Sequence, residues 1–132
     1  MGFMEAITTV FRNKYATFSG RASRSEYWWG YLGLAVTGAV LQIFWLVGTI
    51  ALLDFGQIAA LPSLIALVGA LGMLIPCIAV TVRRLHDTGK SGWMFLIILI
   101  PCIGLILWIV WMVEDGQAHD NAYGPVPTNT LE

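Results

Sequence analysis

The sequence predicts an all-α integral membrane protein that forms a single domain over residues 1–132. Apolar residues make up 58% of the chain and charged residues only 11%, whereas soluble proteins have roughly 45–50% and about 25%. Three uncharged stretches are each long enough to cross a bilayer, which takes about 20 apolar residues. Because a backbone in lipid must satisfy its own hydrogen bonds, these stretches are expected to be helices.

The expected transmembrane helices cover residues 28–53, 58–82 and 93–113. Gly89 is a plausible stop for the second of these helices and Ser91 a plausible cap for the third. The last two spans are therefore expected to form a tight helical hairpin. Residues 114–132 show no hydrophobic periodicity, so they are predicted to be an extended, mobile tail.

An amphipathic helix is predicted over residues 3–13, ahead of the first span. Phe3, Ile7, Val10 and Phe11 recur at helical spacing with polar residues between them. Such a helix is expected to lie in the cytoplasmic membrane interface, and the alternative is a frayed polar leader.

The basic residues indicate an orientation. All seven Lys and Arg residues precede Trp93, either before the first span or between the second and third spans. With three crossings, the positive-inside rule places the amino terminus in the cytoplasm and the carboxyl terminus outside. The net charge of −1 suggests no nucleic-acid partner.

Two polar motifs are expected on the same membrane face. GRASRSEYWW covers residues 20–29 and RRLHDTGKSGW covers residues 83–93, while Tyr-Gly-Pro follows at 123–125. Together they resemble the YhaH/YhaI-like family of small bacterial inner-membrane proteins, domain of unknown function 805. The resemblance implies a helical protein of the bacterial cytoplasmic membrane, and it implies no activity. The family often has Asn-Arg-Tyr-Gly-Pro in the tail, and here Ala122 replaces that Arg.

The two motifs contain the candidate site residues. The basic residues expected to bind anionic lipid head groups or a partner are Arg21, Arg24, Arg83, Arg84 and Lys90. The expected structural polar network consists of Ser23, Glu26, His86 and Asp87. In it, Glu26 and Asp87 are expected to accept hydrogen bonds from the arginines and so to join the first span to the hairpin of the last two spans. Within it, Ser23 and Glu26 fit a capping box, and Asp87 is four residues after Arg83, so the two can pair on one helix. The alternative is that all these residues only set topology and anchor helix ends.

Two further functions remain open from the sequence. His86 and Asp87 could belong to an interfacial lipid-modifying enzyme, although adjacent residues on a helix point about 100° apart. An oligomeric pore or transport subunit is the other alternative, although no charged residue lies inside the spans. No catalytic residue, resident metal or cofactor is predicted.

Several residues inside the spans bear on assembly. Gln42 is expected to form a hydrogen bond across helices or between subunits. Three short spans bury little by themselves, so a homo-oligomer or a partner membrane subunit is expected. Pro76 and Pro101 can kink their helices, and the adjacent Cys77 and Cys102 are either small packing residues or, less simply, Cu(I) ligands.

Overall fold

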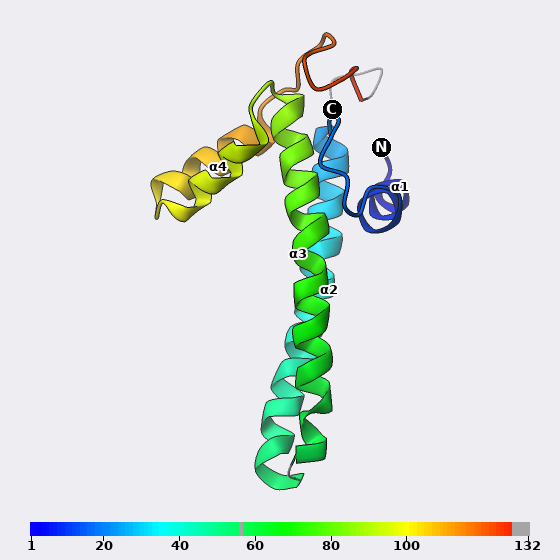
Figure 1. The fold of residues 1–132 in the computed structure, drawn as a ribbon, viewed down its shortest axis with the longest axis vertical. Helices are drawn as coiled ribbons and strands as arrows, with labels where there is room; N and C mark the ends of the chain where they lie inside the picture. The colour runs from blue at the N-terminus through cyan, green and yellow to red at the C-terminus, as the bar shows by residue number, and fades with distance from the viewer. Residues whose placement is uncertain (56, 128–132) are drawn as a thin grey trace.

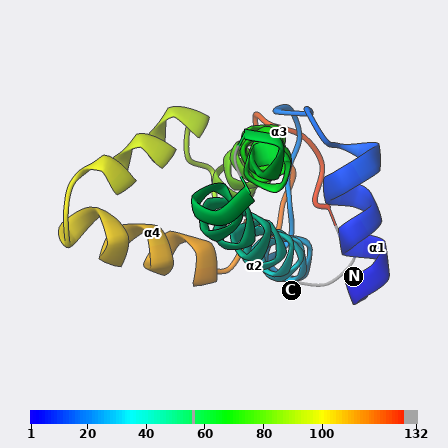
Figure 2. The same cartoon turned by 90° about the horizontal axis from the view of Figure 1, so that it is seen from below.

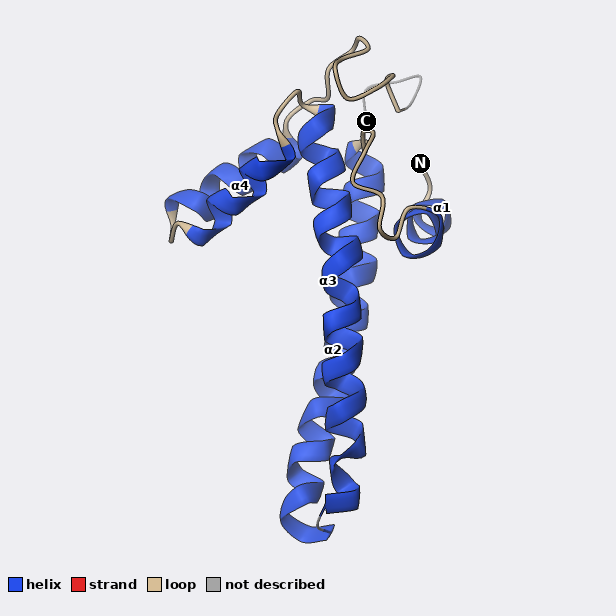
Figure 3. Cartoon of the chain, in the orientation of Figure 1, coloured by secondary structure: helices blue, strands red, loops and turns tan. Residues whose placement is uncertain are grey.

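The computed structural model describes residues 1–55 and 57–127, and within these ranges it contains helices and loops but no strand (Figure 3). The elements in chain order are α1 (Phe3–Thr8), η1 (Thr9–Asn13), α2 (Arg24–Phe55), η2 (Gln57–Ala60), α3 (Leu61–Asp87), η3 (Gly92–Leu99) and α4 (Ile103–Val113). The predicted all-helical class is therefore confirmed.

Helices α2 and α3 form a long antiparallel column joined by η2 (Figure 1). Both are long and apolar enough to cross a bilayer. Glycines allow them to approach closely. A Cβ on Gly48 would lie 2.2 Å from Ser63 Oγ, and one on Gly69 would lie 2.8 Å from Leu41 Cδ2. Most large side chains along the column remain exposed, as expected for a surface that faces lipid.

The amino-terminal segment is helical over residues 3–13, as α1 followed by the π-helical turn η1. Figure 2 shows α1 on one side of the α2–α3 column, with η3 and α4 on the other. A Cβ on Gly30 would lie 2.6 Å from Val10 Cγ2, and one on Gly33 would lie 2.1 Å from Ile7 Cδ1. The apolar face of this segment therefore packs against α2 at two glycines.

Residues 93–113 do not form the single helix that the sequence predicted. The 3₁₀ helix η3 and the helix α4 lie side by side and lean away from the column (Figures 1 and 2). Pro101 has no N–H to continue a helix. Its carbonyl accepts a 2.7 Å hydrogen bond from Ile103 N, and Cys102 between them has a φ of 63°. This γ-turn reverses the chain, so the tight hairpin is formed by η3 and α4 rather than by α3 and a third span.

The close contact between η3 and α4 depends on Gly104. A Cβ there would lie 1.9 Å from the carbonyl oxygen of Ile97. We expect Gly104→Ala to lower the free energy of unfolding by about 1–3 kcal/mol, the range for overpacking, and to speed amide exchange in η3 and α4. In the matched control Gly72→Ala, the new methyl group meets only the Tyr15 hydroxyl at 3.6 Å. Hydrogen exchange of the two variants in detergent measures the difference, and equal exchange in both would contradict this account of the hairpin.

The tail was predicted to be extended, mobile and on the far side of the membrane from the amino terminus. In the structure, residues 114–127 instead pack against the two polar motifs, and residues 128–132 lie outside the described residues. Gln117 N donates to the Asp87 carbonyl at 2.8 Å, and Arg21 Nη1 donates to the His119 carbonyl at 2.8 Å. Because the chain reverses between η3 and α4, the tail returns to the end of the column where α2 begins and α3 ends.

Candidate functional site

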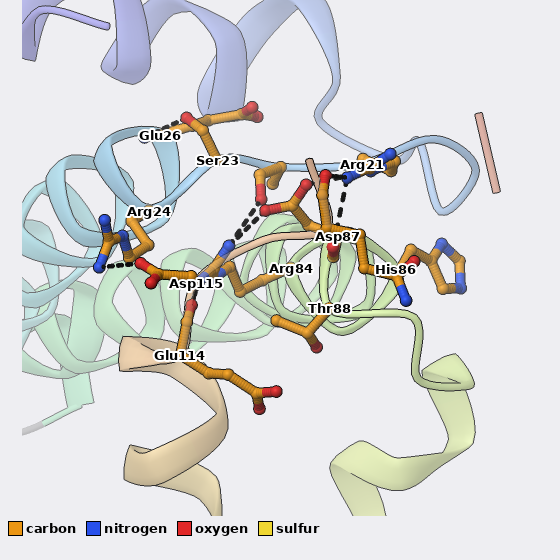
Figure 4. Close-up of polar contacts among 12 residues, drawn as sticks. Arg21, Ser23, Arg24, Glu26, Arg84, His86, Asp87, Thr88, Glu114 and Asp115 are labelled. Atoms are coloured by element: carbon orange, nitrogen blue, oxygen red, sulfur yellow. Dashed lines mark hydrogen bonds and ion pairs between the residues drawn. The ribbon is translucent and has the colours of Figure 1, made fainter. Parts of the chain in front are cut away.

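A buried ion-pair layer joins the beginning of α2, the end of α3 and the tail (Figure 4). At its centre, Asp87 is paired with two arginines. Arg21 Nε lies 3.0 Å from Asp87 Oδ1, and Arg84 Nη1 lies 2.5 Å from Oδ2. All three side chains are at most 4% exposed. Burial of this kind makes Asp87 necessary, because removing its carboxylate leaves two buried arginines without their acidic partner.

Arg83 and Glu26 form a second buried ion pair, which connects α3 to α2. Arg83 Nε also donates to the Thr17 carbonyl at 3.1 Å. The expected pairing of Arg83 with Asp87 is therefore wrong. Arg83 lies on the side of α3 that faces α2, where it pairs with Glu26. The ion pair within α3 is formed by Arg84, three residues before Asp87. The expectation that Glu26 and Asp87 accept hydrogen bonds from these arginines is confirmed.

The arginines also bind the backbone of the returning chain. Arg84 Nε donates to the Met112 carbonyl at 3.2 Å, and its Nη2 donates to the Glu114 carbonyl. Arg21 Nη2 donates to the Gln117 carbonyl at 2.5 Å. Since Met112 and Glu114 lie at the end of α4, the ion-pair layer fixes where the hairpin rejoins the column.

The remaining two basic residues of the predicted site form exposed pairs with acids of the tail. Arg24 Nη1 lies 2.8 Å from Asp115 Oδ1, and Lys90 Nζ lies 2.6 Å from Glu114 Oε2. Each of the five predicted anion-binding residues thus has a carboxylate partner. The sequence interpretation missed Glu114 and Asp115 because it placed the tail across the membrane. Their opposite charge was a signal that the two segments could meet.

Local hydrogen bonds set the two helix ends that hold these side chains. Ser23 Oγ accepts from Glu26 N at 3.2 Å, as expected for a cap, but the Glu26 carboxylate pairs with Arg83 instead of completing the capping box. At the end of α3, Gly89 has a φ of 77°, and Lys90 N donates to the Leu85 carbonyl at 2.9 Å. Ser91 Oγ accepts from Trp93 N at 3.4 Å and caps η3, as predicted.

His86 is oriented by groups other than Asp87. Its Nδ1 lies 3.0 Å from the Gly20 carbonyl oxygen, and its ring stacks on Tyr123 with centroids 4.0 Å apart and planes at 2°. A carbonyl only accepts hydrogen bonds, so Nδ1 carries a hydrogen and a neutral imidazole has its lone pair on Nε2. A Cβ on Gly92 would lie 3.3 Å from Nε2, and Nε2 forms no hydrogen bond with the described residues.

A groove of about 490 Å³ lies between the end of α3 and η3, next to the His86 ring. This volume is within the usual range of ligand pockets, about 300–1,000 Å³. The groove is lined by Phe18, Ile78, Val82, His86, Ser91, Gly92, Trp93, Phe95 and Tyr123. Its walls are mostly apolar, and the His86 and Ser91 side chains supply polar atoms. The sequence interpretation did not identify this groove, because its wall includes Tyr123 of the tail, which that interpretation placed across the membrane.

The two cysteines occupy different settings. Cys77 is half-buried on α3, and Cys102 is exposed at the turn between η3 and α4. Within the described residues no group of three or more His, Cys, Asp or Glu side chains could hold a metal ion.

Comparison with known proteins establishes the family. The model of the protein family of unknown function DUF805 matches residues 15–125, a range that includes both polar motifs and the returning tail. The chain belongs to this family. The DUF805 match therefore spans the whole ion-pair layer and the groove, and the resemblance inferred from the motifs is confirmed.

Curated relatives of this chain come from Escherichia coli strain K12. The chain is 32% identical to the inner membrane protein YhaI over 94% of this chain and 96% of the relative. It is 34% identical to the inner membrane protein YhaH over 94% and 97%. It is also 39% identical to the uncharacterized protein YiiR over 76% of this chain and 56% of that protein. No solved structure matches the chain.

Proposed function

We propose that this protein is a non-enzymatic integral membrane module of the bacterial inner membrane that binds a membrane lipid, with an acyl chain in the groove between α3 and η3. The observation that carries the proposal is the mostly apolar groove of about 490 Å³ with His86 and Ser91 in its wall. Lipids combine a long apolar chain with a polar head, and this lining matches both parts.

The proposed topology has two spans, α2 and α3, with both described chain ends on the cytoplasmic face. Helix α4 has 11 residues, which at 1.5 Å per residue gives about 16 Å, far less than the roughly 30 Å apolar core of a bilayer. The η3–α4 hairpin is therefore proposed to enter the membrane from the cytoplasmic face and return. The turn meets the requirement that backbone groups in lipid be hydrogen-bonded within the protein. The N–H groups of Ile100, Ile103 and Gly104 all donate to carbonyls within the hairpin.

This topology places all seven basic residues at the cytoplasmic end, in agreement with the positive-inside rule. It also suits the α1–η1 segment, which packs on α2 near that end and exposes Phe3 and Met4. We propose that this segment lies in the interface.

The basic residues are proposed to have two different roles. Arg21, Arg83 and Arg84 are at most 3% exposed and serve the fold. The Arg24 and Lys90 side chains are 32% and 19% exposed, so they are the predicted anion-binding residues that can still reach a lipid phosphate. Each nearby basic residue adds about 1 kcal/mol of attraction to an anionic membrane surface. Anionic lipids are therefore the favoured ligands.

Filling the groove should weaken lipid binding. We expect Ile78→Trp to weaken binding of dioleoyl phosphatidylglycerol at least about tenfold, because displacing even two buried methylene groups costs about 1.6 kcal/mol. Native mass spectrometry of the detergent-solubilised protein, titrated with this lipid, gives the affinity and the number of lipids per chain.

The matched control adds the same indole ring outside the groove. Ile106 on α4 is 63% exposed and does not line the groove, so Ile106→Trp should bind like the unmodified protein. Equal affinity in both variants would show that the groove is not the lipid site. Titration with dioleoyl phosphatidylcholine tests the preference for an anionic head group.

A further inference from the structure

We infer that two copies of this chain associate in the membrane through the face of α2 that carries Gln42. This inference rests on α2 and α3 spanning the bilayer and is independent of lipid in the groove. It begins from the part of the column that lies away from the ion-pair layer. In Figure 1 neither α1 nor the η3–α4 hairpin reaches this part, and its outward side chains are exposed.

Gln42 stands out from the other polar residues of this region. Thr37 donates its hydroxyl to the Gly33 carbonyl at 2.9 Å, and Thr49 donates to the Trp45 carbonyl at 2.8 Å. Ser63 also donates to the Trp45 carbonyl. Each of these hydroxyls is satisfied within the chain. The Gln42 side chain is exposed and forms no hydrogen bond with any residue that the structure describes.

The depth of Gln42 makes this lack of a partner costly. It lies fourteen residues after Trp28 on α2, which is about 21 Å along the helix and within a core of roughly 30 Å. Lipid tails offer an amide neither a donor nor an acceptor, so the amide requires a protein partner. An amide both donates and accepts, so a second Gln42 satisfies it.

Symmetry explains why the partner is a second copy. Two copies with the same orientation in one membrane are related by a two-fold axis along the membrane normal, and equivalent residues then lie at the same depth. Gln42 on one copy can therefore meet Gln42 on the other. Few other partners are guaranteed to present an amide at that depth.

The surface around Gln42 has the shape for close approach of another helix. A groove of about 240 Å³ runs between α2 and α3 at this level, and its wall includes Gly38, Gln42, Ala66 and Ala70. A Cβ on Gly38 would meet nothing within 4 Å. The space beside Gly48 and Gly69 is filled by the α2–α3 contact. The space beside Gly38 is open and lies next to the Gln42 amide.

Cysteine cross-linking in native membranes tests this contact. In a background with Cys77→Ala and Cys102→Ala, Ala39→Cys lies one turn from Gln42 on the same face of α2. Val40→Cys is the control, because its exposed side chain points about 200° away from Gln42 around the helix. We expect oxidation to give disulfide-linked dimers from Ala39→Cys and few from Val40→Cys. Equal cross-linking at both positions, or none at Ala39, would overturn the proposal.

The role of the amide is tested by Gln42→Leu, which keeps a side chain of similar size. We expect the dimer dissociation constant in lipid vesicles, measured by single-molecule subunit counting, to rise about 3- to 30-fold. Gln42→Asn should restore part of the association. Because Gln42 has no hydrogen-bond partner among the described residues of its own chain, Gln42→Leu should leave the thermal stability of the monomer unchanged. An unchanged dissociation constant, or a destabilised monomer, would contradict the proposed contact between copies.

Discussion

Replacing Asp87 with Asn is expected to lower the free energy of unfolding by about 3–5 kcal/mol, the usual loss when one partner of a buried ion pair is removed. The Arg21 and Arg84 guanidinium groups would both lose their carboxylate partner while the surrounding segments continue to bury them. Denaturant unfolding in detergent, followed by circular dichroism, measures the change. The variant should also release the tail, so protease cleavage after α4 should become faster.

Asp115→Asn is the matched control, because it removes an acid from the same layer at its exposed edge. The Asp115 side chain is 67% exposed and its partner Arg24 is 32% exposed, so the expected loss is only about 0–1 kcal/mol. A loss for Asp87→Asn no larger than that for Asp115→Asn would mean that the central pair does not hold the layer together.

The sequence was sufficient to predict the ion-pair layer in outline, because charge is rare in this chain. With so few charged residues, the two motifs had few partners other than each other. Glu26 and Asp87 were correctly expected to accept hydrogen bonds from the arginines. Sequence spacing alone did not predict which arginine pairs with which acid. Arg83 pairs with Glu26 on α2, and Arg84 pairs with Asp87.

The broken third segment was missed because length and hydropathy do not distinguish a spanning helix from an apolar hairpin. Residues 93–113 pass the length test for a span. The signals against one helix were Pro101 and Gly104, close together in the middle of the stretch. Helix-breaking residues are common in transmembrane helices, so a sequence interpretation gives them little weight. The groove beside His86 was missed because its wall also includes Tyr123, a residue of the tail that was expected on the other side of the membrane.

The position of the tail gives a prediction with an all-or-none result. In a background without the native cysteines, Asn13→Cys and Ala118→Cys should both resist a membrane-impermeant maleimide in intact spheroplasts and react after permeabilisation. Gln57→Cys, at the opposite end of the α2–α3 column, should react without permeabilisation. A third span would instead make Ala118→Cys react together with Gln57→Cys.

Placing the tail outside would remove more than a few surface contacts. Arg84 would lose the Met112 and Glu114 carbonyls, and Arg21 would lose the Gln117 and His119 carbonyls. Each of these hydrogen bonds to a charged group contributes about 1.5–3 kcal/mol. Asp87 pairs with the two arginines that bind the tail. We therefore expect Asp87→Asn to make Ala118→Cys react faster after permeabilisation. The labelling of Asn13→Cys and Gln57→Cys should stay unchanged.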